Sequence, residues 1–179
     1  MIDLLICNGS IVDGTGNPGY YGNVIVEGDR VRIHRGNIGD FEAARTINAT
    51  GLVVSPGFID LHSHGGLTML WEPKNEPKIR QGITTELIGI DGNSAAPFKT
   101  REDLEAFIEL DSGLNDTMPV GRDWRSVDDF LSMFEKAVSP NIAFILGNSQ
   151  PRIWSVGWND RPAAGHELED MKSVVREAM

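Results

Sequence analysis

The chain has 179 residues, of which 40% are hydrophobic and 23% charged, proportions that are ordinary for a soluble globular protein. Its 16 Lys and Arg residues are outnumbered by 26 Asp and Glu residues, which gives a net charge of -10. Such a chain repels phosphate backbones and anionic lipid surfaces, so we expect neither nucleic acid nor a membrane as a partner.

Cysteine content and hydropathy further narrow the class of protein. The single cysteine, Cys7, excludes an internal disulfide and a zinc site made of paired cysteines, and its apolar neighbours predict a buried structural thiol. No stretch approaches the ~20 apolar residues of a membrane span. The first residues also lack the basic segment and apolar core of a signal peptide, so we expect a cytoplasmic protein.

Residues 1–56 read as short strands and tight turns, rich in Val and Ile and punctuated by Gly, Asn and Asp. Within them, 23–34 alternates apolar and polar residues on both sides of Gly28 and Asp29, which predicts a β-hairpin with a two-residue turn. The glycines of "DGTGNPG" have the spacing of a dinucleotide-binding loop. A strand-like segment follows them where a helix should begin, so we interpret 13–19 as a turn-rich connection.

Residues 57–179 alternate predicted strands and helices. Buried strands are expected at 57–62, 82–90 and 141–147. Helices are expected at about 72–80 and at 163–179. Two more are expected to begin after Thr100 and after Ser126, because each of these residues has an Asp three residues later, as in a capping box. This alternation is typical of βαβ units around a parallel sheet. The last helix is predicted to turn four apolar residues inward: Leu168, Met171, Val174 and Val175.

The stretch "FIDLHSHGG" carries two of the four histidines, His62 and His64, at the end of the first predicted strand. On a strand, Asp60, His62 and His64 project to the same side. Two neutral imidazoles so placed can bind one metal ion at about 2.0–2.1 Å, and the following glycines let the backbone turn away. The alternative is a histidine pair that only forms hydrogen bonds on a half-buried strand, and this motif alone favours neither.

Asp91 follows the second predicted strand, at the end of a parallel sheet where the loops of a βα fold converge. Its carboxylate is either a metal ligand or part of an Asp-Gly turn that bonds its own backbone, and the residues alone favour the turn. After the third strand, the predicted loop 146–162 contains Arg152 and Trp154. These two and Trp158 either line a substrate pocket, with Arg152 binding a carboxylate through two hydrogen bonds, or pack the loop against the rim of the sheet. His34 and His166 are interpreted as surface residues.

Four stretches, taken in order, resemble the amidohydrolase superfamily, and within it most closely the N-acyl-D-amino-acid deacylases. They are "NGSIVDGTGNPGYYGNVIVEGDRV", "VVSPGFIDLHSHGG", "RQGITTELIGIDGNSAAP", and "ILGNSQPR" with "RPAAGHELEDMKSVVREAM". The likeness extends over essentially the whole chain but only about the first third of a typical family member. It implies an α/β fold: part of a small β-sandwich over 1–56, and over 57–179 the first βα units of an incomplete (β/α)8 barrel.

The resemblance also implies site residues. His62 and His64 correspond to the metal ligands of the first barrel strand, and the implied cofactor is a divalent metal, zinc before others. Asp91 stands where the deacylases usually have a cysteine, and because a carboxylate is a harder ligand than a thiolate, this weakens an exclusive preference for zinc. Asn148 replaces a histidine of the family pattern, and Gly65 with Gly66 replaces two aspartates of many members. These replacements bear on substrate preference, and we take Asn148, with Arg152 and Trp154, as a candidate substrate-binding residue.

The implied reaction is metal-dependent hydrolysis of the amide bond of N-acyl-D-amino acids to a carboxylate and a D-amino acid. The family's later histidine ligands and its general base, an aspartate, would lie beyond Met179, so we expect little or no activity from this chain alone. We expect a fragment, a truncated product or one part of a two-chain assembly. The alternatives are a dihydropyrimidinase- or dihydroorotase-like hydrolase of cyclic amides, and a non-catalytic homologue retained for metal binding or assembly.

Overall fold

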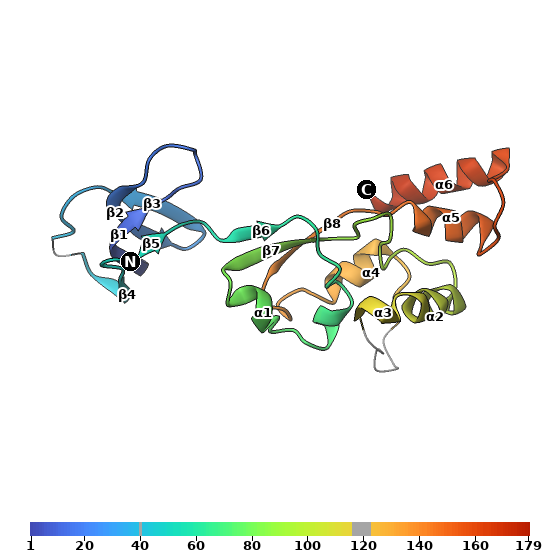
Figure 1. Ribbon diagram of the computed structural model, residues 1–179, viewed down its shortest axis with the longest axis horizontal. Helices are drawn as coiled ribbons and strands as arrows, with labels where there is room; N and C mark the ends of the chain where they lie inside the picture. The colour runs from blue at the N-terminus through green and yellow to red at the C-terminus, as the bar shows by residue number, and fades with distance from the viewer. Residues whose placement is uncertain (40, 116–122) are drawn as a thin grey trace. The chain divides into compact units, whose positions relative to one another are not determined.

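The computed structural model describes residues 1–39, 41–115 and 123–179. They form two compact units, Met1–Pro56 and Gly57–Met179 (Figure 1). Among the helices in these ranges, none combines the length and apolar character that crossing a membrane requires.

The first unit is one mixed β-sheet. Its central strand β1 (Ile2–Ile11) pairs antiparallel with β2 (Tyr20–Glu27) and parallel with β4 (Ala43–Asn48) and β5 (Val53–Val54), while β3 (Arg30–His34) pairs antiparallel with β2. Glu27 pairs with Arg30, which confirms the hairpin and its two-residue turn. A strand and not a helix follows the glycine-rich segment 13–19, as predicted. Cys7 is buried, which also agrees with the sequence.

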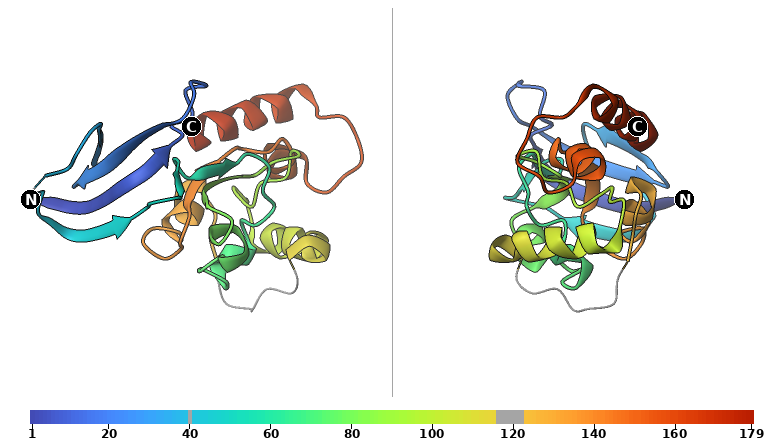
Figure 2. Two further views of the ribbon diagram at one scale, coloured as in Figure 1. Left: turned by 60° about the vertical axis from the view of Figure 1, so that its left-hand side comes forward. Right: turned by 90° about the vertical axis from the view of Figure 1, so that its right-hand side faces the viewer.

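The second unit is built on a parallel sheet of three strands, in the order β6 (Phe58–Asp60), β7 (Ile83–Ile88) and β8 (Asn141–Phe144). The 3-10 helix η1 (Thr68–Leu70) and α1 (Glu76–Ile79) connect the first two strands. Helices α2 (Arg101–Leu110), α3 (Ser112–Asn115) and α4 (Val127–Ser132) follow β7, and α5 (Ser149–Val156) and α6 (Gly165–Ala178) follow β8. Figure 1 and the left view of Figure 2 show α2 and α6 on opposite sides of the strands. The predicted α/β fold is confirmed.

The main core of this unit lies between β7 and the helices that follow it. Ile88 of β7 packs there with Leu104 and Phe107 of α2 and with Phe130 of α4, all at most 3% exposed. Both predicted helix starts are confirmed. The Thr100 hydroxyl accepts a hydrogen bond from the Asp103 amide, and Ser126 forms a full capping box with Asp129.

Strand β6 corrects the prediction of a buried apolar strand over 57–62. It ends at Asp60, and the side chains of Phe58, Ile59 and Leu61 are 59–68% exposed. The strand is an edge of the three-stranded sheet, so among the described residues it has a neighbouring strand, β7, on one side only. An apolar sequence identifies a strand here but not its burial.

One helix prediction and one loop prediction also need correction. The helix expected at 72–80 is reduced to α1, because Asn75 has left-handed backbone angles (φ 44°, ψ 44°) that end any earlier helical run. The loop expected over 146–162 contains α5. Its proline, Pro151, sits in the first turn, where a missing amide costs nothing, and Gly157 ends it with a φ of 69°.

Helix α6 shows its apolar residues in a different arrangement from the one expected. Val174 is buried (6% exposed), but Leu168 and Val175 are 46% and 40% exposed. These two residues and Met171 line a groove of about 770 Å³ between β8 and α6. The prediction that all four apolar residues pack inward is therefore wrong.

The start of α6 supplies a pH-dependent contribution to stability. The Arg161 guanidinium donates hydrogen bonds of 2.7 and 2.5 Å to the Glu167 carboxylate, which also accepts one from the Ala164 amide. The Arg161 bonds, followed by the amide bond, lower the pKa of Glu167 from 4.5 to about 2. A depressed carboxyl pKa stabilises the folded chain above the unfolded pKa, and the contribution is lost as the pH falls from about 4.5 towards 2.

We therefore expect Glu167→Gln to lower the free energy of unfolding by a constant amount above pH 5 and by progressively less below pH 4.5. Urea unfolding followed by tryptophan fluorescence measures this, because all four tryptophans belong to the second unit. Glu169→Gln on the same helix is the comparison: Lys172 also lowers the pKa of this exposed carboxyl, but by less, so its substitution should cause a smaller loss with the same pH dependence. A loss that is independent of pH between 2 and 7 contradicts the assignment.

Candidate metal centre

Two loops bring the candidate ligands together. His62 and His64 follow β6, and Asp91 follows β7, the neighbouring parallel strand. Both loops leave the carboxyl ends of their strands and therefore lie at the same edge of the sheet.

The three side chains converge on one point. Asp91 Oδ2 lies 3.2 Å from His62 Nε2 and 3.3 Å from His64 Nε2, and one ligand atom from each residue lies within 4.8 Å of the others. Two ligands at about 2.1 Å from a tetrahedral ion are about 3.4 Å apart, close to these separations. The side chains are 64%, 39% and 53% exposed for His62, His64 and Asp91, which leaves room for further ligands. This donor set of two imidazoles and a carboxylate fits a divalent cation such as zinc.

The backbone around Asp91 explains how its carboxylate reaches the histidines. The Asn93 amide donates to the Ile90 carbonyl at 3.0 Å, and Asp91 and Gly92 between them have φ values of 56° and 80°. Positive φ at both central positions is typical of a type I′ turn, which Asp tolerates better than most residues. The predicted Asp-Gly turn is present in the backbone, but within the described residues the Asp91 carboxylate contacts the two imidazoles and makes no hydrogen bond to its own backbone. The turn and the proposed ligand role are thus compatible.

The sequence suggested that the alternation of side chains along a strand directs both histidines to one side, but the structure shows that they do not lie on the strand. Strand β6 ends at Asp60, and Asp60 contacts Lys78 instead of joining the three convergent residues. The segment that holds the histidines is fixed by other bonds. The Asp60 carboxylate accepts from the His62 amide at 3.0 Å, and the Ser63 amide donates to the Leu87 carbonyl at 3.1 Å.

A partly buried polar cluster that the sequence analysis missed lies behind this segment. It consists of Asp60, Ser63, Asn75, Lys78 and Glu86, with the Glu86 side chain completely buried. The one sequence signal for it was a glutamate within the apolar strand "GITTELIGI". A buried carboxylate requires partners, so this residue indicated an internal polar contact without identifying it.

A second missed residue is Asp111, at the carboxyl end of α2. It lines a cavity of about 30 Å³ together with Ser63 and His64. Burial raises the pKa of Asp111, although a hydrogen bond from the Asn115 amide group and the nearby His64 oppose the shift. Nothing in its local sequence separates it from any other carboxylate at a helix end.

Asn148, a candidate substrate-binding residue, lies beside the Asp91 loop. It is exposed and directly precedes α5, where its side chain makes no capping hydrogen bond. The Ser149 amide donates to the Gly92 carbonyl at 2.9 Å, and a Cβ on Gly147 would lie only 2.3 Å from that oxygen. This close backbone contact holds the loop after β8 against the loop after β7.

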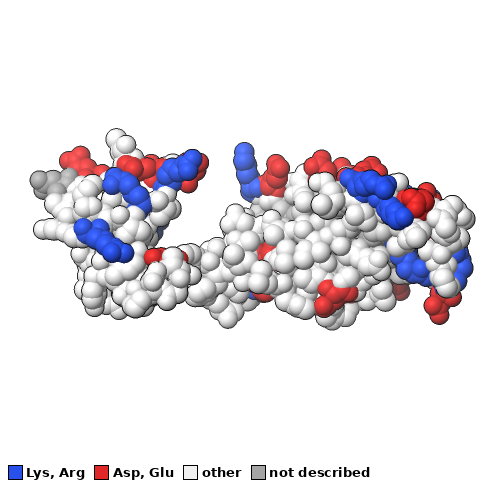
Figure 3. All heavy atoms as spheres, turned by 90° about the horizontal axis from the view of Figure 1, so that it is seen from above, with Lys and Arg blue, Asp and Glu red and all other residues white. Residues whose placement is uncertain are grey.

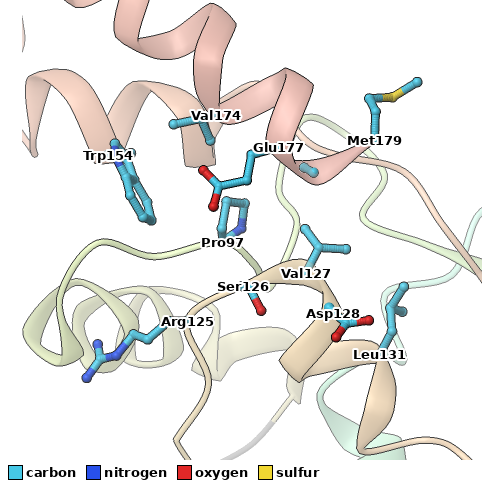
Figure 4. A pocket seen from close by; sticks show the side chains of 11 residues that line it. Pro97, Arg125, Ser126, Val127, Asp128, Leu131, Trp154, Val174, Glu177 and Met179 are labelled. Carbon is cyan, nitrogen blue, oxygen red and sulfur yellow. The ribbon is translucent and has the colours of Figure 1, made fainter.

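The structure gives Arg152 and Trp154 other surroundings. The Arg152 guanidinium donates to the carbonyls of Asn159 and Arg161, both at 2.7 Å, and so holds the segment that leads from α5 to α6. Trp154 lines a pocket of about 430 Å³ formed with residues of α4 and α6, seen from close by in Figure 4. None of the three convergent residues lines that pocket. That Arg152 and Trp154 contact substrate stays a prediction.

The distribution of charge offers no second candidate on the face shown in Figure 3. Among the described residues there, Lys and Arg side chains are interspersed with Asp and Glu in each unit and form no continuous basic patch. The expectation that nucleic acid is not a partner rests on the net charge and stays a prediction.

Comparison with known proteins shows which proteins the chain resembles. Residues 45–128 match the amidohydrolase family. A D-aminoacylase from Alcaligenes xylosoxydans xylosoxydans is 32% identical over 177 residues, which are 99% of this chain and 35% of that protein. An N-acyl-D-aspartate deacylase from the same organism is 29% identical over 177 residues, which are 99% of this chain and 34% of that protein.

Solved structures agree with the sequence comparison. A D-aminoacylase described with a binuclear metal centre superposes with a TM-score of 0.81 at 31% identity, over 99% of this chain and 36% of that one. An N-acyl-D-glutamate deacylase from Bordetella bronchiseptica, complexed with zinc and a phosphonate inhibitor, gives a TM-score of 0.81 at 27% identity over the same shares.

These likenesses confirm the predicted resemblance to the amidohydrolase superfamily, a class of hydrolases. Within that class, the resemblance to the N-terminal third of the N-acyl-D-amino-acid deacylases is confirmed as well. The chain spans about a third of the length of the relatives it matches.

Proposed function

We propose that the chain is the N-terminal part of a metal-dependent hydrolase that cleaves the amide bond of N-acyl-D-amino acids. One observation carries the proposal: His62, His64 and Asp91 converge at the carboxyl ends of two neighbouring strands. The D-aminoacylase that aligns with 99% of the chain at 32% identity supports the choice of substrate class. Zinc is the proposed cation, since two imidazoles and a carboxylate are among its usual ligands.

The residues of the chain have distinct parts in this reaction. His62 and His64 would hold the cation through their ring nitrogens, and Asp91 would add a carboxylate oxygen and negative charge beside both rings. A divalent cation in this position supplies Lewis-acid polarisation of the amide carbonyl and lowers the pKa of water. Water adds to the carbonyl carbon, the C–N bond breaks, and the nitrogen leaves as the free amine of a D-amino acid.

Proton transfer requires a general base, and we propose that sequence beyond Met179 supplies it. Such a base takes the proton of the attacking water and returns it to the leaving nitrogen. The three-stranded sheet also provides only part of a barrel. We therefore propose that the 179-residue chain alone has little or no deacylase activity and needs the rest of a barrel from a longer chain or a partner chain.

The test compares the zinc-loaded chain alone with the same chain extended by the coding sequence downstream of Met179. Substrates are N-acetyl-D-glutamate, N-acetyl-D-aspartate and N-acetyl-D-leucine, with the L-enantiomers as controls. We expect the extended protein to release D-amino acids and the chain alone to release little or none. Full activity of the chain alone contradicts the assignment of the base.

The same assay includes hydantoin and dihydroorotate, because a dihydroorotase from Streptococcus thermophilus is 44% identical over 61 residues. That similarity covers 34% of this chain, against 99% for D-aminoacylase, so the deacylase is preferred. Opening of either ring without deacylation would establish the cyclic-amide alternative. Bound zinc with neither activity in the extended protein would support a non-catalytic role.

A further inference from the structure

The segment that carries the two histidines is positioned mainly by polar side chains. One backbone hydrogen bond, from the Ser63 amide to Leu87, ties it to β7. On either side of that bond, the Asp60 carboxylate accepts from the His62 amide at 3.0 Å and the Ser63 hydroxyl oxygen accepts from the Gly65 amide at 3.1 Å. The direction of the His62 amide thus depends on Asp60, and the direction of the Gly65 amide, directly after His64, depends on Ser63.

Both of these anchoring side chains contact Lys78. Its ammonium group donates to Asp60 Oδ2, and it lies 3.3 Å from Ser63 Oγ and 3.3 Å from Glu86 Oε2. The Ser63 hydroxyl donates to Glu86, and so does the side-chain amide of Asn75. Lys78 is therefore the one ammonium group within a cluster that contains two carboxyl groups.

Electrostatics makes this ammonium necessary to the cluster. Glu86 has no exposed surface and the Asp60 side chain is only 22% exposed, so both carboxyl groups depend on a nearby counter-charge. Burial by itself would lower the pKa of Lys78, but the hydrogen bond to Asp60 and the charge of Glu86 outweigh it and raise the pKa. The Lys78 ammonium group and the Asp60 carboxylate contact each other as an ion pair.

We propose that Lys78 is a positioning residue for the cation site. It fixes Asp60 and Ser63, and these fix the backbone from which the two imidazoles extend. Lys78 itself is not among the residues whose ligand atoms converge. The inference rests on the proposed function, because it takes His62 and His64 to hold a divalent cation.

The test measures zinc affinity of the 179-residue chain by competition with a chromophoric chelator, and the visible absorption spectrum of its Co²⁺ form. We expect Lys78→Met to weaken zinc binding by about 10- to 100-fold, the usual effect of losing a residue that orients metal ligands. The Co²⁺ spectrum should change with it, because the imidazoles take a new geometry. Lys78→Arg, which keeps a cation beside both carboxylates, should restore most of the affinity.

Arg80→Met is the matched control. It removes a cation two residues further on, whose partner is the exposed Glu76, and should change neither affinity nor spectrum. Asp60→Asn provides a second variant, since it keeps an acceptor for the His62 amide but breaks the ion pair with Lys78. It should also weaken zinc binding. The double variant Lys78→Met/Asp60→Asn should lose less binding free energy than the sum of the two single losses, because both changes break the same contact.

The outcomes separate this inference from the proposed function. If the unmodified chain binds no zinc, the metal centre and the inference both fail. If it binds zinc and a folded Lys78→Met chain has the same affinity and Co²⁺ spectrum, only the inference fails. Should Lys78→Met not fold, unchanged values for Asp60→Asn overturn the inference in the same way.

Discussion

Replacing both His62 and His64 by alanine is expected to abolish stoichiometric zinc binding by the chain. The two Nε2 atoms lie 3.2 and 3.3 Å from a common carboxylate oxygen, and the double variant leaves Asp91 as the only member of the described cluster. One exposed carboxylate cannot replace two imidazoles as ligands of a transition metal. Elemental analysis after dialysis against metal-free buffer gives the zinc content per chain.

The chain offers a control with the same number of histidines removed. His34 lies in the first unit with its Nε2 3.1 Å from the Asn37 carbonyl, and His166 is exposed at the start of α6. His34→Ala with His166→Ala should leave zinc content unchanged. A stoichiometric zinc content in the His62→Ala/His64→Ala chain would show that the cation, if bound, lies elsewhere.

The sequence was sufficient to identify which loops meet. A pair of histidines after one predicted strand and an aspartate after the next define the same edge of a parallel sheet, whatever the detailed conformation of each loop. This holds because the direction and order of parallel strands place the loops, and both follow from the alternation of strands and helices. The type I′ turn at Asp91 could also be anticipated from Asp followed by Gly.

The sequence could not give the orientation of the individual side chains. The pleat argument assumed that the strand continues through His64, whereas β6 ends at Asp60. Beyond that residue, the direction of the histidines depends on contacts with Lys78 and Glu86, which lie 18 and 26 residues further along the chain than Asp60. Local periodicity carries no information about such contacts.

Burial was misjudged where it depends on neighbours that the described chain does not provide. The apolar residues of β6 and of α6 have the pattern of core positions, yet Ile59 and Leu168 are 61% and 46% exposed. In contrast, β7 has a strand on each side, and its Ile88 is 2% exposed. Apolar patterning therefore predicts which face of a strand or helix is suited to packing, but it does not show whether a strand or helix covers that face.

Gly89→Ala is expected to destabilise the second unit by about 3 kcal/mol or more, the range of the most damaging single substitutions. Gly89 follows β7 with a φ of 86°, and a Cβ there would lie 2.0 Å from the Ile145 carbonyl oxygen and 3.2 Å from Ser94 Cβ. The backbone oxygen cannot move away freely, because the Ile145 amide is bonded to Ile88 at 2.9 Å. Urea unfolding followed by tryptophan fluorescence measures the loss.

Gly92→Ala separates steric overlap from backbone strain. Gly92 lies in the same loop with a φ of 80°, but the nearest atom to a Cβ there is 4.0 Å away. Left-handed angles alone cost an alanine about 1–2 kcal/mol, so Gly92→Ala should be the milder change.

Asp91 lies two residues after Gly89, so the overlap of the new Cβ with the Ile145 carbonyl oxygen should also displace the Asp91 carboxylate. Zinc binding should therefore weaken in any Gly89→Ala chain that remains folded. Equal losses of stability for the two variants would mean that the loops after β7 and β8 separate easily, and the close packing that aims Asp91 at the histidines would then have no energetic basis.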